Sequence, residues 1–345
     1  MVSLVVVSLF TLSSEEDNNV KHIYKILIGI VTTCVLFFAI DWLVGTWSEM
    51  MYYKSKYGIF HRQIYCLQES KDDIMILGSS RAAHHYVPKI FEDSLRMSCY
   101  NAGSDGMCIY YHYAILASRI HRRVPPKMVI LEVMGTDAEV SKGATFSLDA
   151  ALDRLAPHYG EVPEIDSLFA LNGWMESLKL LFKTYRYNSK FVQIIKCNYV
   201  PWLEDKGYEA LTGTMEVVDG NVADVLDVSG NAKIEYRKVE YVQKLIDLCK
   251  NNKIKLVMCF SPYYNASESD GMLVIKKLAE NNNVPFLDYG ENHLFQKTDY
   301  FRDESHLNDN GATAYTKEIV KQIRKKCYYA LDEILGSAFC LSQRR

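Results

Sequence analysis

The chain has no surplus of positive charge and no cysteine pairs of the kind that bind metals. Its 345 residues include 39 Lys and Arg and 42 Asp and Glu, which gives a formal net charge of -3, and the two signs are interspersed. Because no basic face is evident that would follow a phosphate backbone, we expect no nucleic-acid partner. The nine cysteines are odd in number and scattered without a Cys-x-x-Cys spacing, so we expect no zinc site, no dithiol redox site and no cofactor.

A long apolar segment near the N-terminus is the first strong signal. Residues 26–47 carry a single charge, Asp41, and as a helix they would be roughly 33 Å long, enough for the core of a bilayer. Trp42 and Trp47 suit the interfacial belt at one end. No Ala-x-Ala-like cleavage site follows, so we expect a transmembrane helix over residues 23–48 rather than a signal peptide.

The regions that flank this helix are expected to be peripheral. Residues 1–22 form an N-terminal tail whose own apolar stretch is too short to span a membrane. Residues 49–71 are charged and rich in tyrosine, which suits a juxtamembrane connector. The positive charges on the two sides are nearly balanced and do not set the orientation of the helix.

From Asp73 onward, short apolar runs alternate with longer amphipathic ones. This alternation predicts an α/β domain over residues 72–335, with a doubly wound, five-stranded parallel sheet and a C-terminal tail over residues 336–345. The expected strands are Ile74–Leu77, Cys99–Asn101, Met128–Val133, Lys255–Phe260 and Pro285–Asp288. The expected helices are Pro88–Leu95, Met107–His121, Tyr236–Lys250, Met272–Asn281 and Ala312–Leu335.

The alternation stops between residues 140 and 231, which predicts an insertion between the third and fourth strands. It contains helical patches at Asp166–Phe182 and Ser189–Cys197 and a weak strand-like stretch at Met215–Val218. The insertion is therefore expected to be mostly helical.

Three side chains suited to nucleophilic catalysis follow two different strands. Ser80 begins a helix where the first strand breaks at Gly78, and His306 follows the fifth strand with Asp303 three residues before it. The carboxyl ends of parallel strands share one rim, so these residues are expected to meet as a nucleophile, its base and an orienting acid. The alternative is that Ser80 belongs to an ordinary turn and that Asp303 only caps the last helix.

Other residues at this rim are candidates for substrate contacts. Arg81 would either hold an anionic group or pair with a nearby carboxylate. Tyr263 and Tyr264 would either stack on a sugar or belong to a proline turn. His84 and His85 are expected to form local hydrogen bonds rather than a metal site, because no third ligand is evident.

Three blocks of sequence resemble the SGNH/GDSL hydrolase superfamily. They are Gly78-Ser79-Ser80, Asn101-Ala-Gly103 and Asp303-x-x-His306, in that order. The resemblance covers roughly residues 73–335 without the insertion, and it implies a flavodoxin-like sheet. It also implies that substrates are acyl esters, often acetyl groups on carbohydrate.

The resemblance assigns a role to each of these residues. It makes Ser80 the nucleophile, His306 the general base and Asp303 the group that orients the imidazole. The backbone N–H groups of Ser80 and Gly103 would stabilise the oxyanion. Thr136 would be the third donor.

Two positions depart from the family pattern. Ser79 stands where the first block usually has an aspartate, and Thr136 stands where the third block usually has an asparagine. A threonine hydroxyl has a shorter stem than the asparagine amide, and the loss of one oxyanion donor costs roughly a hundredfold to a thousandfold in rate.

These features together predict a membrane-anchored serine esterase or O-acyltransferase. We expect a single-pass protein of a bacterial cell membrane that acts on carbohydrate or an acylated envelope polymer. The resemblance to anchored family members places the globular domain outside the cytoplasm. The alternative is a non-catalytic SGNH-fold envelope protein that serves as a carbohydrate-binding or assembly module. Hydrolysis versus transfer and the oligomeric state stay open.

Overall fold

The computed structural model describes residues 2–216, 233–265 and 268–342, and the side chains from 20 to 325 within those ranges. Five parallel strands form one sheet in the order β2-β1-β3-β4-β5. Their bounds are β1 Ile74–Leu77, β2 Cys99–Asn101, β3 Met128–Glu132, β4 Lys255–Phe260 and β5 Phe286–Asp288. All five predicted strands are confirmed, with end differences of one residue in β3 and β5. The order reverses between β1 and β3, the switch point where doubly wound sheets place their sites.

The sheet is buried on both faces, as the prediction of a doubly wound fold requires. One face packs against helices α5 (Ile109–His121), α11 (Tyr236–Asn251) and α12 (Asp270–Asn281). The other face packs against α3 (Ser80–His85), α4 (Pro88–Leu95) and α13 (Asp309–Ser342). Strand side chains alternate between these two cores: Met75 and Leu77 face the first, while Ile74 and Ile76 face the second.

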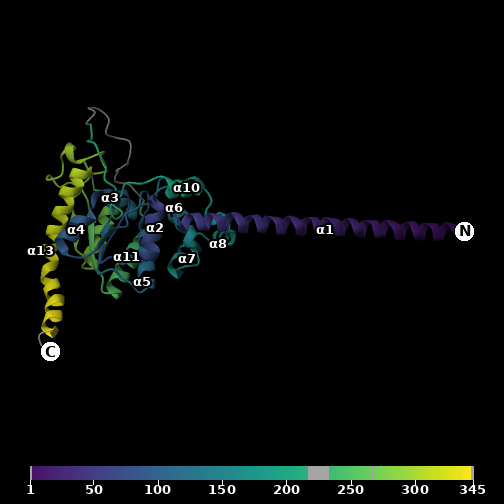
Figure 1. Cartoon of the computed structure of the whole chain (residues 1–345), viewed down its shortest axis with the longest axis horizontal. Helices are drawn as coiled ribbons and strands as arrows, with labels where there is room; N and C mark the ends of the chain where they lie inside the picture. The colour runs from purple at the N-terminus through teal and green to yellow at the C-terminus, as the bar shows by residue number, and fades with distance from the viewer. Residues whose placement is uncertain (1, 217–232, 266–267, 343–345) are drawn as a thin grey trace.

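Helix α1 (Val2–Tyr53) is longer than the predicted membrane helix in both directions. Residues 1–22 were expected to be a separate tail, but no proline or glycine interrupts the helix before Gly29. Its segment Val20–Tyr53 is long and apolar enough to cross a membrane, and its most apolar window has a mean hydropathy of 2.3 and is not buried. Figure 1 shows α1 projecting far from the globular part.

The connector over residues 49–71 is folded onto the globular part. It contains α2 (Gly58–Ile64) and a short π-helix, Tyr65–Glu69. Cys66 and Leu67 belong to the main core. The Arg62 side chain is buried and pairs with Glu209 of the insertion.

The insertion is helical in its described part, and the predicted patch Ser189–Cys197 corresponds to a helix shifted by two residues at each end, but the other predicted patch differs. Its helices are α6 (Leu148–Leu155), α7 (Pro163–Ala170), α8 (Trp174–Lys179), α9 (Lys183–Arg186) and α10 (Phe191–Tyr199). The prediction of one patch over 166–182 is wrong, because the chain breaks at Gly173, which has a φ of 89°. Of the predicted strand-like stretch, Met215 is irregular and donates its N–H to the carbonyl oxygen of Phe301, and Val218 lies outside the described residues.

The last helix, α13, begins three residues before the predicted start. Asn308 caps it, because its Oδ1 accepts a hydrogen bond from the N–H of Gly311 at 3.0 Å. The helix continues to Ser342, so residues 336–342, which were expected to be a tail, are helical.

Candidate active site

Ser80 lies at the start of α3, directly after the turn that ends β1. Gly78 has a φ of 150°, and a Cβ atom there would lie 2.8 Å from the Cβ atoms of both Ala82 and Glu132. Only glycine fits this turn. The tight turn places the Ser80 side chain at the rim of the sheet and its N–H in the first turn of α3, where amides have no acceptor within the helix.

The loop before α13 brings His306 to the same rim. Asp303 Oδ1 accepts hydrogen bonds from the N–H groups of Ser305 at 2.9 Å and His306 at 3.0 Å, and this small turn explains the three-residue spacing. A bridge between Phe301 and Leu307 closes the loop. The turn therefore fixes the imidazole relative to the carboxylate before any substrate arrives.

Ser80, His306 and Asp303 form a continuous hydrogen-bonded chain. His306 Nε2 lies 2.8 Å from Ser80 Oγ, and His306 Nδ1 lies 2.9 Å from Asp303 Oδ1. The structure thus brings together the three residues predicted from the sequence. It also disfavours the alternative in which Ser80 and Asp303 serve only a turn and a cap, because Asn308 caps α13.

The negative charge of Asp303 sets the direction of proton transfer among these three hydrogen-bonded residues. Burial raises the pKa of Asp303, but hydrogen bonds from His306 and Ser305 outweigh this effect and lower the pKa to about 2. An ionised Asp303 accepts a hydrogen bond from the Nδ1–H group of His306, so the lone pair of Nε2 faces the Ser80 hydroxyl. The imidazole is therefore in the tautomer that a general base requires.

Beneath this chain lies a buried polar network centred on Ser261. Arg81 is 2% exposed, and its guanidinium donates to Ser261 Oγ at 2.8 Å and pairs with Glu132 at 3.3 Å. The Ser261 hydroxyl donates to Glu132 Oε1 at 2.7 Å. Of the two alternatives for Arg81, the structure supports pairing with a carboxylate, so this guanidinium is not available to a substrate.

His85 connects this network to the loop that carries His306. The N–H of Leu307 donates to His85 Nε2 at 2.9 Å, so the proton of this imidazole is on Nδ1, which lies 2.7 Å from Ser261 Oγ. Burial, with Arg81 nearby, lowers the pKa of His85 well below its usual range. A neutral, buried histidine thus holds the backbone next to His306.

The other rim candidates lie close to the same loop. His84 is buried and its Nδ1 lies 2.8 Å from the carbonyl oxygen of Glu209, 125 positions away, so the prediction that this histidine bonds locally is wrong. The N–H of Tyr264 donates to the carbonyl oxygen of Glu304 at 2.9 Å. The ring of Tyr263 lies 5.5 Å from the Arg81 guanidinium carbon, and both tyrosines are only partly buried.

One of the predicted oxyanion donors already donates a hydrogen bond within the protein. The N–H of Gly103 donates to Asn101 Oδ1 at 3.0 Å, so the donor expected at Gly103 is committed in this conformation. Thr136 lies in a turn directly after β3, and its Oγ1 is buried without a hydrogen-bond partner in the described part of the chain. An unpaired buried hydroxyl is unusual and costly.

The most important residues that the sequence reasoning missed are Glu132 and Ser261. A signal existed for Glu132, because a carboxylate at the end of an otherwise apolar, fully buried strand requires a partner. Ser261 carried no such signal, because a serine before a proline reads as an ordinary turn.

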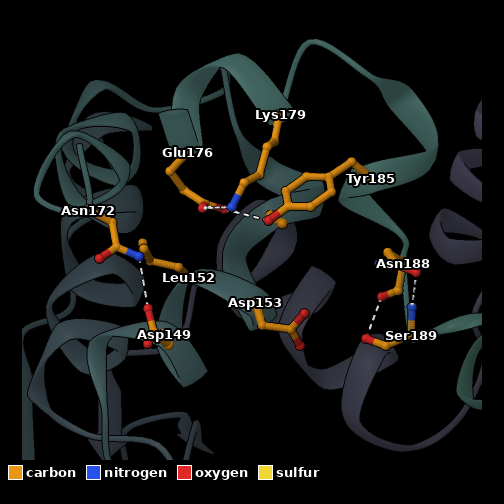
Figure 2. A pocket seen from close by; sticks show the side chains of 10 residues that line it. Asp149, Leu152, Asp153, Asn172, Glu176, Lys179, Tyr185, Asn188 and Ser189 are labelled. Carbon is orange, nitrogen blue, oxygen red and sulfur yellow. Dashed lines mark hydrogen bonds and ion pairs between the residues drawn. The ribbon is translucent and has the colours of Figure 1, made fainter. Parts of the chain in front are cut away.

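A cavity of about 340 Å³ lies within the insertion (Figure 2). Its lining is mostly polar and comes from α6, α8 and the segment after α9. These side chains largely satisfy one another: Tyr185 donates to Glu176 at 2.8 Å, and Asn172 donates to Asp149 at 2.8 Å. None of the predicted site residues lines this cavity.

Comparisons with known proteins give distant structural similarities only. No family model and no curated protein matches the chain. A GDSL-like lipase from Bacteroides thetaiotaomicron is similar at 13% identity over 74% of this chain and 89% of that one, with a TM-score of 0.33. An acetyl xylan esterase is similar at 15% identity over 73% and 98% of the two chains, with a TM-score of 0.34. The case for a function therefore rests on the geometry of this chain's own residues.

Proposed function

We propose that the chain is a serine esterase or O-acyltransferase of the SGNH/GDSL type. One observation carries the proposal: the hydrogen-bonded chain from Ser80 Oγ through the His306 imidazole to Asp303, at 2.8 and 2.9 Å. When an alcohol, an imidazole and a carboxylate are hydrogen-bonded in this order, the alcohol becomes a nucleophile at neutral pH.

The reaction would proceed through an acyl-enzyme. His306 Nε2 takes the Ser80 proton as Oγ attacks the carbonyl carbon of an ester, and Asp303 stabilises the imidazolium that forms. His306 then gives the proton to the leaving alcohol, and the acyl group remains on Ser80. Water or a second hydroxyl attacks the acyl-enzyme with His306 again as base, which yields an acid or a new ester and restores Ser80.

The proposed donors to the oxyanion are the Ser80 N–H and the Thr136 hydroxyl. The first lies at the positive end of α3, which favours a developing negative charge. The second has no competing partner in the described residues. The partly exposed His306 and half-exposed Asp303 leave the rim open to a bulky acyl carrier. Acetylated carbohydrate or an envelope polymer fits this openness, and Tyr263 and Tyr264 are the candidate surfaces for sugar stacking.

We also infer that α1 anchors the protein in a bacterial cell membrane as a single span, with the catalytic domain outside the cytoplasm. The anchor is supported by the length and exposed apolar surface of Val20–Tyr53. The outward placement stands on the resemblance to anchored family members alone.

The rival function is a non-catalytic binding or assembly module with the same fold. The committed N–H of Gly103 and the threonine at position 136 favour it, because both weaken the oxyanion site. The two functions separate in one assay: the full-length protein in detergent is incubated with 4-nitrophenyl acetate, with and without sugar acceptors, beside its Ser80→Ala variant. Ser80-dependent release of nitrophenol supports the enzyme, and acetylated acceptor identifies transfer. Equal rates for the two proteins support the binding module.

Replacing Thr136 by valine tests the proposed hydroxyl donor. Valine keeps the shape and removes only the hydroxyl, so kcat for an acetyl ester is expected to fall roughly a hundredfold. Thermal stability should be unchanged or slightly higher, because an unpaired buried hydroxyl is removed. A variant that keeps the full kcat would show that the Thr136 hydroxyl takes no part in the reaction.

The pH profile of kcat/KM tests the assignment of charges. Hydrogen bonds from His306 and Ser305 overcome the effect of burial on the pKa of Asp303, which is about 2, so this carboxyl stays ionised above about pH 3. Only one proton should therefore be taken up on the acid limb, with a tenfold fall in activity per pH unit, and Asp303 should not contribute to it. A slope of two in this range would mean that Asp303 is protonated as well.

A further inference from the structure

We propose that residues 174–203, comprising α8, α9 and α10 and here called the collar, form a second membrane contact. The collar would insert into the boundary between headgroups and acyl chains of a bilayer that contains anionic lipid. This inference rests on the proposed anchoring by α1 and extends it, because it gives the globular domain its own lipid-binding surface.

The collar packs on the part of α1 that lies within the apolar segment. The Phe182 ring stacks on Phe38, with ring centroids 5.9 Å apart and an interplanar angle of 9°. Asp41, the single charge in residues 26–47, accepts hydrogen bonds from the N–H groups of Lys183 at 2.9 Å and Thr184 at 3.0 Å. The collar thus contacts α1 at a depth where the apolar segment would still be in contact with lipid. Its backbone N–H groups also supply hydrogen bonds to Asp41, the carboxylate at that depth.

Helix α8 is amphipathic, but its polar side faces the protein and its apolar side faces outward, the reverse of a helix on a water-exposed surface. Its polar side chains Glu176 and Lys179 point into the cavity of Figure 2 together with Tyr185. Its apolar side chains point outward: Trp174 is 73% exposed, and Met175 is 50% exposed. Water would favour the reverse arrangement, whereas a lipid surface favours this one.

The apolar surface continues on α10 and beyond it. Val192, Ile195 and Tyr199 recur at helical spacing and are exposed, while Leu203, which follows the helix, is 95% exposed. Helix α10 also contacts α1, since the Phe191 ring lies 5.7 Å from the Trp47 ring and Asn198 donates to the carbonyl oxygen of Met51 at 2.8 Å. Figure 1 shows α8 and α10 on the two sides of α1 where it leaves the globular part.

The charge of the collar suits an anionic lipid surface. Residues 174–203 contain five basic side chains and one acidic side chain, a net charge of +4, although the whole chain has a net charge of -3. The basic side chains are Lys179, Lys183, Arg186, Lys190 and Lys196; Lys179 pairs with Glu176, Lys183 pairs with Glu49, and the buried Lys190 pairs with Asp153. Exposed tryptophan and tyrosine beside lysine and arginine are typical of membrane interfaces, where the long cationic side chains reach the headgroups.

Quenching of single tryptophans by brominated lipid tests the collar. The chain has four tryptophans, at positions 42, 47, 174 and 202, and all are exposed at the surface of the described residues. Two full-length variants keep one each, with phenylalanine at the other three positions: one keeps Trp174 in the collar, and the other keeps Trp42 in α1. A third has phenylalanine at all four positions and carries Tyr236→Trp, at an 82% exposed site on α11.

The variants are reconstituted in vesicles of brominated phosphatidylcholine and phosphatidylglycerol, and circular dichroism verifies their folding. We expect Trp174 to lose fluorescence to a degree comparable with Trp42, while the tryptophan at 236 does not. Quenching of Trp42 without quenching of Trp174 would overturn the collar and leave the anchor intact. If Trp42 is not quenched either, the anchoring itself fails and the collar with it. Equal quenching of Trp174 without phosphatidylglycerol would overturn the role of anionic lipid.

Discussion

Replacing His306 by alanine is expected to lower kcat/KM for an acetyl ester by roughly 10⁴- to 10⁶-fold. Without the imidazole, no base among the described residues lies within hydrogen-bonding distance of the Ser80 hydroxyl, and the leaving alcohol loses its proton donor. The side chain is partly exposed, and the buried His85 holds the adjacent backbone independently, so the fold should be retained. Steady-state kinetics of the full-length protein in detergent, together with circular dichroism, measures both.

His293 provides the matched control for this substitution. It is an exposed histidine thirteen positions before His306 and lies outside the hydrogen-bonded chain. His293→Ala should leave kcat/KM unchanged. Substantial activity in His306→Ala would mean that Ser80 is activated by another group or is not the nucleophile.

Replacing Arg81 by methionine is expected to lower the free energy of unfolding by about 3–5 kcal/mol, because the buried Glu132 then loses its ion-pair partner. Both side chains are at most 2% exposed, and the guanidinium lies 4.5 Å from the centre of the Phe260 ring. Methionine keeps an apolar side chain against that ring, so the decrease in the free energy of unfolding comes mainly from the lost charge of Arg81. Burial raises the pKa of Glu132 and Arg81 opposes this, so the variant should take up a proton at Glu132 more readily. Denaturant titration in detergent measures the change.

The double variant Arg81→Met with Glu132→Gln separates the charge from the packing. Glutamine removes the buried charge and still accepts a hydrogen bond from Ser261, so the double variant should be more stable than the sum of the single losses predicts. Additive losses, or an Arg81→Met variant as stable as the wild type, would show that the pair does not stabilise the fold.

The sequence predicts the sheet and the catalytic chain because both depend on local patterns. Residues 74–77 and 128–131 are continuous apolar runs, which parallel strands buried on both faces require. Once the strands are parallel, residues that follow them share one rim, and this is enough to bring Ser80 and His306 together from 226 positions apart.

The remaining features depend on contacts between distant segments that no local pattern encodes. Arg81 meets Ser261 across 180 positions, and His85 meets Leu307 across 222. The N–H of Gly103 donates to Asn101 because the amide of Asn101 has a fixed orientation. Two hydrogen bonds from its Nδ2, to the carbonyl oxygens of Ala82 and Tyr86, set this orientation. The insertion was hard to predict for another reason, since its helices are short and are stabilised by packing on α1 and α5 rather than by their own periodicity.

Reaction with a fluorophosphonate probe tests the catalytic assignment most directly. The probe bonds covalently only to a serine oxygen that a neighbouring base has activated. We expect one adduct on the full-length protein, mapped by mass spectrometry to Ser80, and its loss in both Ser80→Ala and His306→Ala. An unlabelled wild-type protein, or labelling of Ser80 that persists in His306→Ala, would contradict the account.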